Sequence, residues 1–304
     1  MRAGDPRARR RVGGGPLTVT SPSVASTSGA EIPAGRLVPL PDEGRVLTST
    51  RRVRWGDVSA AGPARLDALG AYMADVASDD HASLGLGGDF PWVVLRVAFE
   101  ISRPPVFLED LTLHTWCSGL GLRWAERRVS MRGDQGAVVD GAILWVAYDT
   151  ATGASVRVPA AYKAACGSAA LGRTVSSALQ HPPPRANKDV IRDPGARRSR
   201  PPWTWRAPDF DPFGHVNNAS AWALVDHLLA DRPALQRDAR CEMEYHRPIG
   251  PNDLLCVVVE DGADGSLRAW ALGTQDDRHP GELYLSATAV PLDTLRSTVP
   301  ASDE

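Results

Sequence analysis

The sequence has few cysteines, no long apolar run and almost no excess of charge. Its four cysteines among 304 residues stand apart and form no CxxC pair, which excludes a zinc ribbon and a disulfide scaffold and favours a reducing cytoplasm. No apolar run approaches the ~18 residues of a membrane helix, so we expect no spanning segment. The formal net charge is −2, whereas nucleic-acid binders are normally strongly basic, so we expect no nucleic acid partner.

Two stretches lack apolar periodicity and divide the chain. In residues 1–45, several arginines are followed by Gly, Ser, Thr and Pro rather than by an apolar segment, which predicts a disordered tail and not a targeting signal. Residues 161–202 become dense in Pro and Arg and predict a linker. We therefore expect two folded domains, at residues 46–160 and 203–304.

Positive charge gathers in these irregular stretches. Residues 172–206 hold eight Lys or Arg against two Asp, and residues 1–45 hold seven Arg against four acids, which leaves the remaining residues with a net charge of −11. The linker is therefore either a solvated tether or a docking site for an acidic partner. In the docking alternative, the residues that would bind the acidic partner are Arg197, Arg198 and Arg200.

The two predicted domains repeat one pattern. Asp57 and Gly62 in the first align with Asp209 and Gly214 in the second, and a stretch with helical apolar spacing follows each turn. The apolar positions of these helices are Leu66, Leu69 and Met73 in the first domain and Trp222, Val225 and Leu229 in the second.

Strands are expected after each helix. Residues 96–116 match residues 240–260, because both contain a Glu (Glu100, Glu244), then Arg-Pro, an acidic turn and an apolar run. Alternating apolar and polar residues downstream predict antiparallel strands with one solvated face. Each domain is thus an α+β unit whose sheet buries one helix, and two copies can pair as a pseudo-dimer.

The segment DFDPFGHVNN, residues 209–218, resembles the turn into the central helix of hotdog-fold thioesterases, in particular the 4-hydroxybenzoyl-CoA thioesterase-like group. The tandem arrangement is similar to the acyl-ACP thioesterases, which carry two hotdog domains in one chain. The first-domain pattern of that family corresponds here to Asp57, His81, Arg103-Pro104-Pro105, Asp110 and Thr115-Trp116. The resemblance implies two tandem hotdog domains, each an antiparallel sheet wrapped around a long helix, forming a pseudo-dimer.

This chain departs from the plant acyl-ACP enzymes at two places. Phe213 stands where those enzymes have an Asn, and Pro248-Ile249 stands where they have a Glu-Cys pair. The family's site residues therefore carry over only to Asp211, His215 and the two following asparagines. The site is closer to the 4-hydroxybenzoyl-CoA type, in which a carboxylate at the Asp211 position is the key catalytic group.

The resemblance implies an acyl thioesterase that hydrolyses an acyl-ACP or acyl-CoA thioester to a free acid, in fatty-acid or polyketide-type metabolism. It implies no metal or redox cofactor. The partner is an acyl carrier protein or CoA, and the chain is either a monomer with an internal pseudo-dimer or a homodimer. Two alternatives stay open: a hotdog dehydratase or isomerase acting on carrier-bound chains, and a non-catalytic acyl-binding module.

Thioester hydrolysis needs donors for the developing oxyanion and a carboxylate that attacks or activates water. Gly214 is predicted at the start of the second helix, where free N–H groups point outward, and Asn218 is a further candidate for binding the thioester. Asp211 is the expected nucleophile or base, and His215 and Asn217 are expected to assist it. Two neighbouring aromatic residues, Phe213 and Trp222, are candidates for the substrate pocket.

Several of these residues also suit purely structural roles, which are alternatives to the catalytic and binding roles above. The asparagines suit helix N-caps, His215 could pack at the turn, and Asp209 matches Asp57 and reads as a turn residue. In the first domain, Ser59 and Pro63 replace the carboxylate and the imidazole, so this copy of the site is expected to be inactive.

Two further groups read as structural. Glu244 shares one face of a strand with Glu242 and His246, and Glu100 repeats it in the domain without a site. His81, which follows Asp79 and Asp80, reads as part of a solvated helix end.

Overall fold

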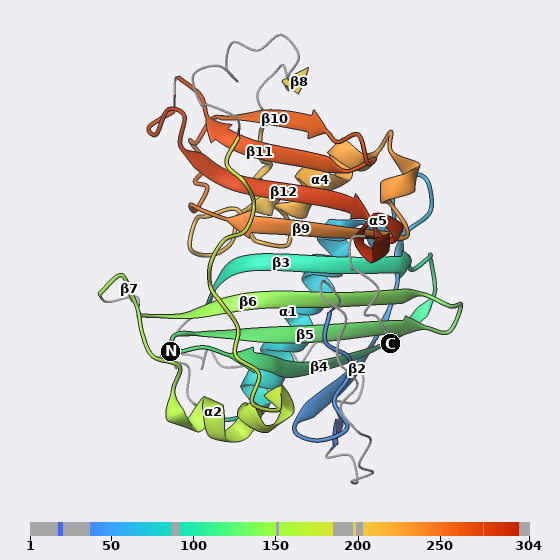
Figure 1. The fold of residues 1–304 in the computed structure, drawn as a ribbon, viewed down its shortest axis with the longest axis vertical. Helices are drawn as coiled ribbons and strands as arrows, with labels where there is room; N and C mark the ends of the chain where they lie inside the picture. The colour runs from blue at the N-terminus through green and yellow to red at the C-terminus, as the bar shows by residue number, and fades with distance from the viewer. Residues whose placement is uncertain are drawn as a thin grey trace, which may run out of the picture.

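The computed structural model describes residues 18–20, 37–86, 92–149, 152–184, 197–198, 203–275 and 277–297. Within these ranges the chain builds one twelve-stranded antiparallel sheet with two central helices on one face (Figure 1). The strand order is β1-β2-β4-β5-β6-β3-β9-β12-β11-β10-β8, with β7 paired to β6. The predicted α+β architecture of two hotdog units in tandem is confirmed.

The first unit contains the longer helix. Its elements are β2 (Val46–Arg52), the 3-10 turn η1 (Trp55–Asp57), α1 (Leu66–Ser83), β3 (Trp92–Arg103), β4 (Asp110–Leu120), β5 (Trp124–Gly133), β6 (Val138–Asp149) and β7 (Ala154–Ser155).

The second unit repeats the order with a shorter helix. Its elements are η3 (Ala207–Asp209), α4 (Trp222–Leu229), η4 (Pro233–Leu235), β9 (Ala239–Tyr245), β10 (Leu255–Asp261), β11 (Leu267–Gly273), β12 (Leu283–Pro291) and the terminal helix α5 (Leu292–Ser297).

The two units join through antiparallel pairing of β3 with β9. Ala98 pairs with Glu242, and on either side of this pair Arg96 faces Glu244 and Glu100 faces Arg240. Since Glu100 aligns with Glu244 in the repeat, Ala98 aligns with Glu242, and the register is symmetric about these two equivalent residues. This is the arrangement of a two-fold dimer contained in one chain, with a continuous sheet across the join.

The helices bury the apolar positions that their spacing predicts. Leu69 and Met73 on α1, and Trp222 and Val225 on α4, are all fully buried. At Gly70 on α1, an added Cβ would lie 3.3 Å from Ala219, just before α4. A residue without a side chain therefore lets α1 pack closely against the segment that leads into α4.

The segment between the units is attached to the sheet rather than free. It begins as α2 (Ala160–Cys166) and the 3-10 turn η2 (Gly167–Ala170), then crosses the sheet face opposite the central helices (Figure 1). Further along, β8 (Arg197–Arg198) pairs with β10. We call residues 171–184 the strap.

Part of the predicted tail also contacts the folded units. Thr18–Thr20 forms β1 and pairs with β2, and Arg45 lies 3.0 Å from Asp80 on α1. The remainder of residues 1–36 lies outside the described residues. No helix among the described ranges is long and apolar enough to cross a membrane.

The end of α1 is not the solvated helix end that the sequence predicts. Asp80 is only 2% exposed, and Arg127, itself buried, lies 2.8 Å from its carboxylate. Burial and the Arg127 charge lower the pKa of neighbouring His81. The strand β5 above the helix supplies this partner, which sequence spacing does not reveal.

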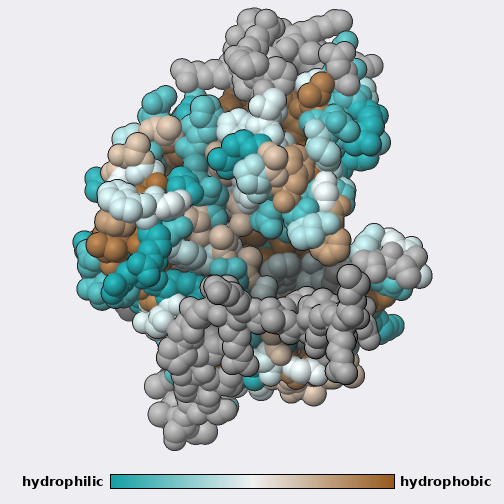
Figure 2. Space-filling model, turned by 180° about the vertical axis from the view of Figure 1, so that it is seen from behind, coloured by the Kyte–Doolittle hydropathy of each residue, from teal (hydrophilic) through white to brown (hydrophobic). Residues whose placement is uncertain are grey.

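Seen from the side opposite the strap, hydrophobic residues reach the surface in patches among hydrophilic ones (Figure 2).

Candidate active site

The turn that precedes α4 is organised by the carboxylate of Asp211. Its Oδ1 accepts hydrogen bonds from the N–H groups of Phe213 (2.9 Å) and His215 (3.1 Å), while the Asp211 N–H donates to the His215 carbonyl at 2.8 Å. Gly214 has a φ of +80°, a conformation that favours glycine. Within the described residues, Asp211 Oδ2 has no hydrogen-bond partner, so this oxygen is free to accept a proton.

The predicted position of the helix start is wrong. Gly214 and His215 lie in the turn, and α4 begins only at Trp222, because the Gly214 N–H closes the turn onto the Asp211 carbonyl at 3.0 Å. The predicted oxyanion role of the Gly214 N–H therefore does not fit. The Asn217 Oδ1 accepts the Ala219 N–H at 2.8 Å and so has the capping geometry.

The N–H group best placed for a ligand is that of Asn218. The Asn218 carbonyl accepts a hydrogen bond from the Tyr245 hydroxyl at 2.7 Å, which fixes the backbone at this residue. The Asn218 N–H has no acceptor among the described residues. Asn218 is exposed, so this donor is open to a substrate.

The two predicted pocket residues differ in burial, and neither lines the cavity found among the described residues. Phe213 is 74% exposed, whereas Trp222 is 0% exposed and packs edge-to-face on Phe99 with ring centroids 4.8 Å apart. Helical periodicity places Trp222 on the apolar face of the helix, but it does not show whether that position lies in the core or in a pocket. The His215 side chain is exposed and makes no hydrogen bond to Asp211.

The first unit forms the same turn without the carboxylate. There the Ser59 N–H donates to the Pro63 carbonyl at 2.8 Å and the Gly62 N–H donates to the Ser59 carbonyl at 3.0 Å, which are the distances of the Asp211 turn. Backbone hydrogen bonds alone therefore maintain this turn. Asp211 and His215 add side chains that the turn itself does not require.

Asp209 has the structural role that the repeat predicts. Its carboxylate accepts the Arg206 N–H at 2.7 Å, as the Asp57 carboxylate accepts the Arg54 N–H at 2.7 Å. Asp209 is 4% exposed, and the guanidinium of Arg206 lies 2.7 Å from it. This hydrogen bond and the nearby charge lower its pKa although burial acts the other way.

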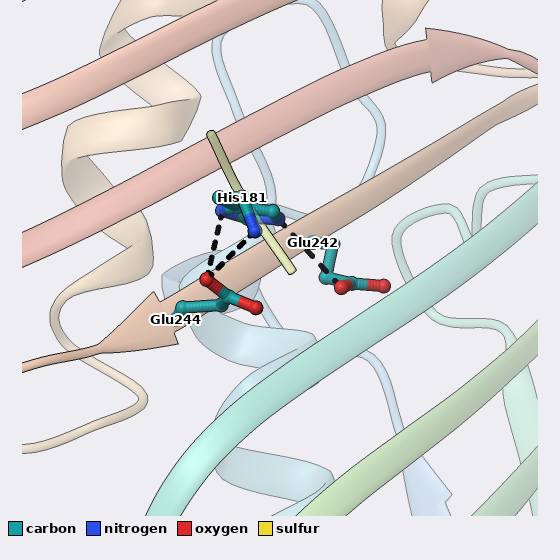
Figure 3. Close-up of side chains that lie close together, drawn as sticks. All are labelled: His181, Glu242 and Glu244. Atoms are coloured by element: carbon teal, nitrogen blue, oxygen red, sulfur yellow. Dashed lines mark hydrogen bonds and ion pairs between the residues drawn. The ribbon is translucent and has the colours of Figure 1, made fainter. Parts of the chain in front are cut away.

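Where the strap crosses β9, His181 of the strap and Glu242 and Glu244 of β9 place ligand atoms within 4.8 Å of one another (Figure 3). The carboxylate of Glu244 already accepts the N–H groups of Gln180 (2.5 Å) and His181 (3.1 Å). Arg240 lies 2.8 Å from Glu242, and His181 Nδ1 hydrogen-bonds the Ser286 hydroxyl at 2.9 Å. These partners make the cluster an anchor for the strap and supply positive charge where a metal ion would otherwise be needed.

Two shifted pKa values support the role of this cluster as an anchor for the strap. Burial alone would raise the pKa of Glu242, but the hydrogen bond from His181 and the Arg240 guanidinium outweigh it and hold that pKa at about 2. The pKa of His246, whose Nε2 hydrogen-bonds the Ser286 hydroxyl at 2.9 Å, is lowered by burial. The predicted structural role of Glu244, on one strand face with Glu242 and His246, agrees with these contacts.

The docking residues are only partly described. Arg197 and Arg198 form β8, paired with Val259 and Val258, but their side chains are outside the description, as is the whole of Arg200. The backbone of Arg197 and Arg198 therefore lies at the β10 edge of the second unit.

Comparison with known proteins agrees with the repeat and its fold. Residues 44–165 match the acyl-ACP thioesterase N-terminal domain family. The uncharacterized protein Rv2001 of Mycobacterium tuberculosis is 29% identical over 229 residues, 75% of this chain and 88% of that protein.

Two solved structures have the same fold over most of their length. The 12:0-ACP thioesterase from Umbellularia californica has a TM-score of 0.62 at 18% identity, covering 84% of this chain and 98% of its own. An acyl-ACP thioesterase from Bacteroides thetaiotaomicron has a TM-score of 0.60 at 17% identity, covering 81% and 97%.

Proposed function

We propose that this chain hydrolyses an acyl thioester held on an acyl carrier protein or CoA, with Asp211 as its catalytic carboxylate. The match of residues 44–165 to the acyl-ACP thioesterase N-terminal domain supports this proposal. The observation that carries this assignment is the duplicated turn. The first unit forms the turn with Ser59 in place of Asp211, so the carboxylate is not needed for folding. Its position on the turn that leads to the open Asn218 N–H favours a role in catalysis.

The reaction needs one carboxylate that accepts and then returns a proton, and one hydrogen-bond donor for the oxyanion. Asp211 Oδ2 takes a proton from a water molecule, the resulting hydroxide attacks the thioester carbonyl carbon, and the Asn218 N–H stabilises the oxyanion. When the tetrahedral intermediate collapses, the carbon–sulfur bond breaks and the thiolate leaves. The proton from Asp211 then goes to the thiolate, which yields a free acid and a free thiol.

Release of thiol from several acyl thioesters tests the activity itself. Free thiol with a matching amount of acid supports hydrolysis, whereas dehydration or isomerisation changes the acyl chain and leaves the thioester intact. Binding without either product would favour the non-catalytic acyl-binding module.

Salt dependence separates a carrier-bound substrate from a small thioester. The described units are acidic apart from the linker, so docking of an acidic carrier protein depends on local basic residues such as Arg197, Arg198 and Arg200. Exposed charges are screened within roughly 8–10 Å at ordinary salt. We expect kcat/KM for an acyl-ACP to fall about tenfold between low and high salt, while that for an N-acyl-cysteamine changes little.

The charge reversal Arg197→Glu/Arg198→Glu/Arg200→Glu should reproduce this loss at low salt for the carrier-bound substrate alone. The matched control is Arg232→Glu, a change at an arginine paired with Asp261 outside the linker. Equal salt responses of the two substrates would contradict carrier docking and favour CoA or a small thioester.

His215→Ala should lower kcat by about 100-fold while KM changes little, because the imidazole would act on water or the reacting centre and not on the acyl chain. Steady-state kinetics with one acyl thioester measure both constants. His215→Gln, which retains a hydrogen-bonding group, is the comparison variant and should lose less. Unchanged kinetics in His215→Ala would reduce His215 to a turn residue.

A further inference from the structure

A cavity of about 410 Å³ lies where the two units meet at the start of α1. Its walls come from the turn of the first unit and from α4 and η4 of the second. Most lining residues are apolar, among them Ala60, Pro63, Ile101, Leu229 and Leu235. A concave, mostly apolar site with few polar groups is the usual form of a small-molecule site.

One carboxylate from the opposite unit enters this cavity. Asp226, on α4, accepts the N–H groups of Leu66 at 3.0 Å and Asp67 at 3.2 Å at the start of α1. These donors are the equivalents of Asn218 and Ala219 in the repeat. The position equivalent to Asp226 on α1 is Ala74, which has no carboxylate. The start of α1 therefore has a carboxylate acceptor from the facing unit.

The charges around the cavity select its ligand. The Asp226 carboxylate repels an anionic acid. The Arg65 guanidinium, which also lines the cavity, is already bonded to Asp67 at 2.9 Å and to the Val58 carbonyl at 3.1 Å. A neutral acyl group with a carbonyl oxygen can accept from the backbone donors and extend its chain along the apolar wall. The hydrolysis product, a carboxylate, is repelled.

An exposed apolar loop adjoins one wall of the cavity. Trp55 is 76% exposed and stacks on Phe107 with ring centroids 4.0 Å apart. Val106, next to Phe107, pairs with Pro63 of the cavity wall.

We propose that this cavity is a second, slower thioester-hydrolysing centre, in which Asp226 acts as general base and the Leu66 and Asp67 N–H groups bind the oxyanion. The inference rests on the proposed thioester hydrolysis but not on Asp211. The thioester oxygen replaces the Asp226 carboxylate at the two donors, and Asp226 takes a proton from water. The hydroxide attacks the carbonyl carbon, the carbon–sulfur bond breaks, and the thiolate receives the proton. The thioester must first displace the Asp226 carboxylate from the Leu66 and Asp67 N–H groups. Because this step costs free energy, hydrolysis is slower here than at Asp211.

The protonation behaviour of Asp226 fits a base that works near neutral pH. Burial, aided by the Asp67 charge, raises its pKa to about 6, although the hydrogen bonds from Leu66 and Asp67 and the charge of Arg65 act in the opposite direction. The thiol of Cys241 on β9 also faces this carboxylate. The base form therefore predominates above about pH 6, and turnover at this centre should fall as pH decreases below that value.

The test isolates the second centre by removing the first. Asp211→Asn is expected to retain a slow release of thiol from octanoyl-N-acetylcysteamine, with an acid limb near pH 6. The double variant Asp211→Asn/Asp226→Asn should lose at least a further tenfold. The matched control is Asp211→Asn/Asp231→Asn, which removes an exposed carboxylate just beyond α4 and should keep the slow rate.

A second variant covers the case in which loss of Asp226 impairs folding. Ala230→Trp, in the Asp211→Asn background, fills the cavity from its exposed wall and keeps the Asp226 carboxylate and the two N–H donors in place. It should also lower the slow rate at least tenfold, with a thermal midpoint close to that of the parent.

The outcomes separate this inference from the assignment of Asp211. Equal slow rates with and without Asp226 would overturn the second centre, and so would a rate increase in Asp226→Asn, which would show that the carboxylate only blocks the donors. If Asp226→Asn alone abolishes turnover while Asp211→Asn retains it, the cavity is the principal centre and the Asp211 assignment fails. Absence of thiol release by the unmodified protein would overturn both.

Discussion

Asp211→Asn is expected to lower kcat/KM for an acyl-ACP by about 100-fold or more, because an amide can neither accept the proton from water nor attack the carbonyl. The fold should persist, since the amide oxygen can still accept the N–H groups of Phe213 and His215, and the equivalent turn at Ser59 forms without a carboxylate. Thiol release under steady-state conditions, together with thermal unfolding, measures both properties.

Asp264→Asn is the matched control for this substitution. Asp264 also organises a turn, accepting the Ser266 N–H at 3.1 Å between β10 and β11, but this turn is far from α4 in the sequence and has no proposed role in catalysis. It should leave kcat/KM unchanged. Similar activity in the two variants would remove Asp211 from the mechanism.

Glu244→Ala is expected to destabilise the protein by about 3 kcal/mol. Glu244 is 0% exposed, and its removal leaves the N–H groups of Gln180 and His181 without their carboxylate acceptor. The strap should then detach from the sheet before global unfolding. Urea unfolding measures the free energy, and limited proteolysis between residues 171 and 184 reports release of the strap.

Glu100→Ala is the internal comparison, because Glu100 occupies the equivalent position in the first unit. Its partner Arg240, at 3.0 Å, keeps a second carboxylate, Glu242, at 2.8 Å. We expect a loss of about 1 kcal/mol or less and no change in proteolysis of the strap. Equal destabilisation by the two variants would show that the strap contacts contribute little.

Several features of this protein follow from local sequence. The spacing of Leu69 and Met73, and of Trp222 and Val225, predicts the buried faces of both helices because a 3.6-residue period is a property of the segment itself. The strand face shared by Glu242, Glu244 and His246 follows equally from the two-residue period of a strand. The repeat of the turn at Asp57 and Asp209 also identifies Asp209 as structural.

Other features depend on which segments meet in three dimensions. The sequence places the start of the second helix at Gly214, but the hydrogen bond from the Gly214 N–H to the Asp211 carbonyl makes this residue part of the turn. Phe213 and Trp222 are both aromatic residues near the motif, and only packing decides that one is exposed and the other lies in the core.

Contacts between segments distant in sequence also decide the path of the strap, the burial of Asp80 and the position of Asp226. Asp226 reads from sequence as a polar residue on an amphipathic helix, and nothing local shows that it reaches the start of α1. Its contacts with Leu66 and Asp67 span about 160 positions of sequence and arise because β3 and β9 pair about a pseudo-two-fold axis that brings the helices together. The sequence thus determines the two units and the Asp211 motif, whereas the pairing of the units decides which carboxylate faces which helix, because that contact exists only across the join.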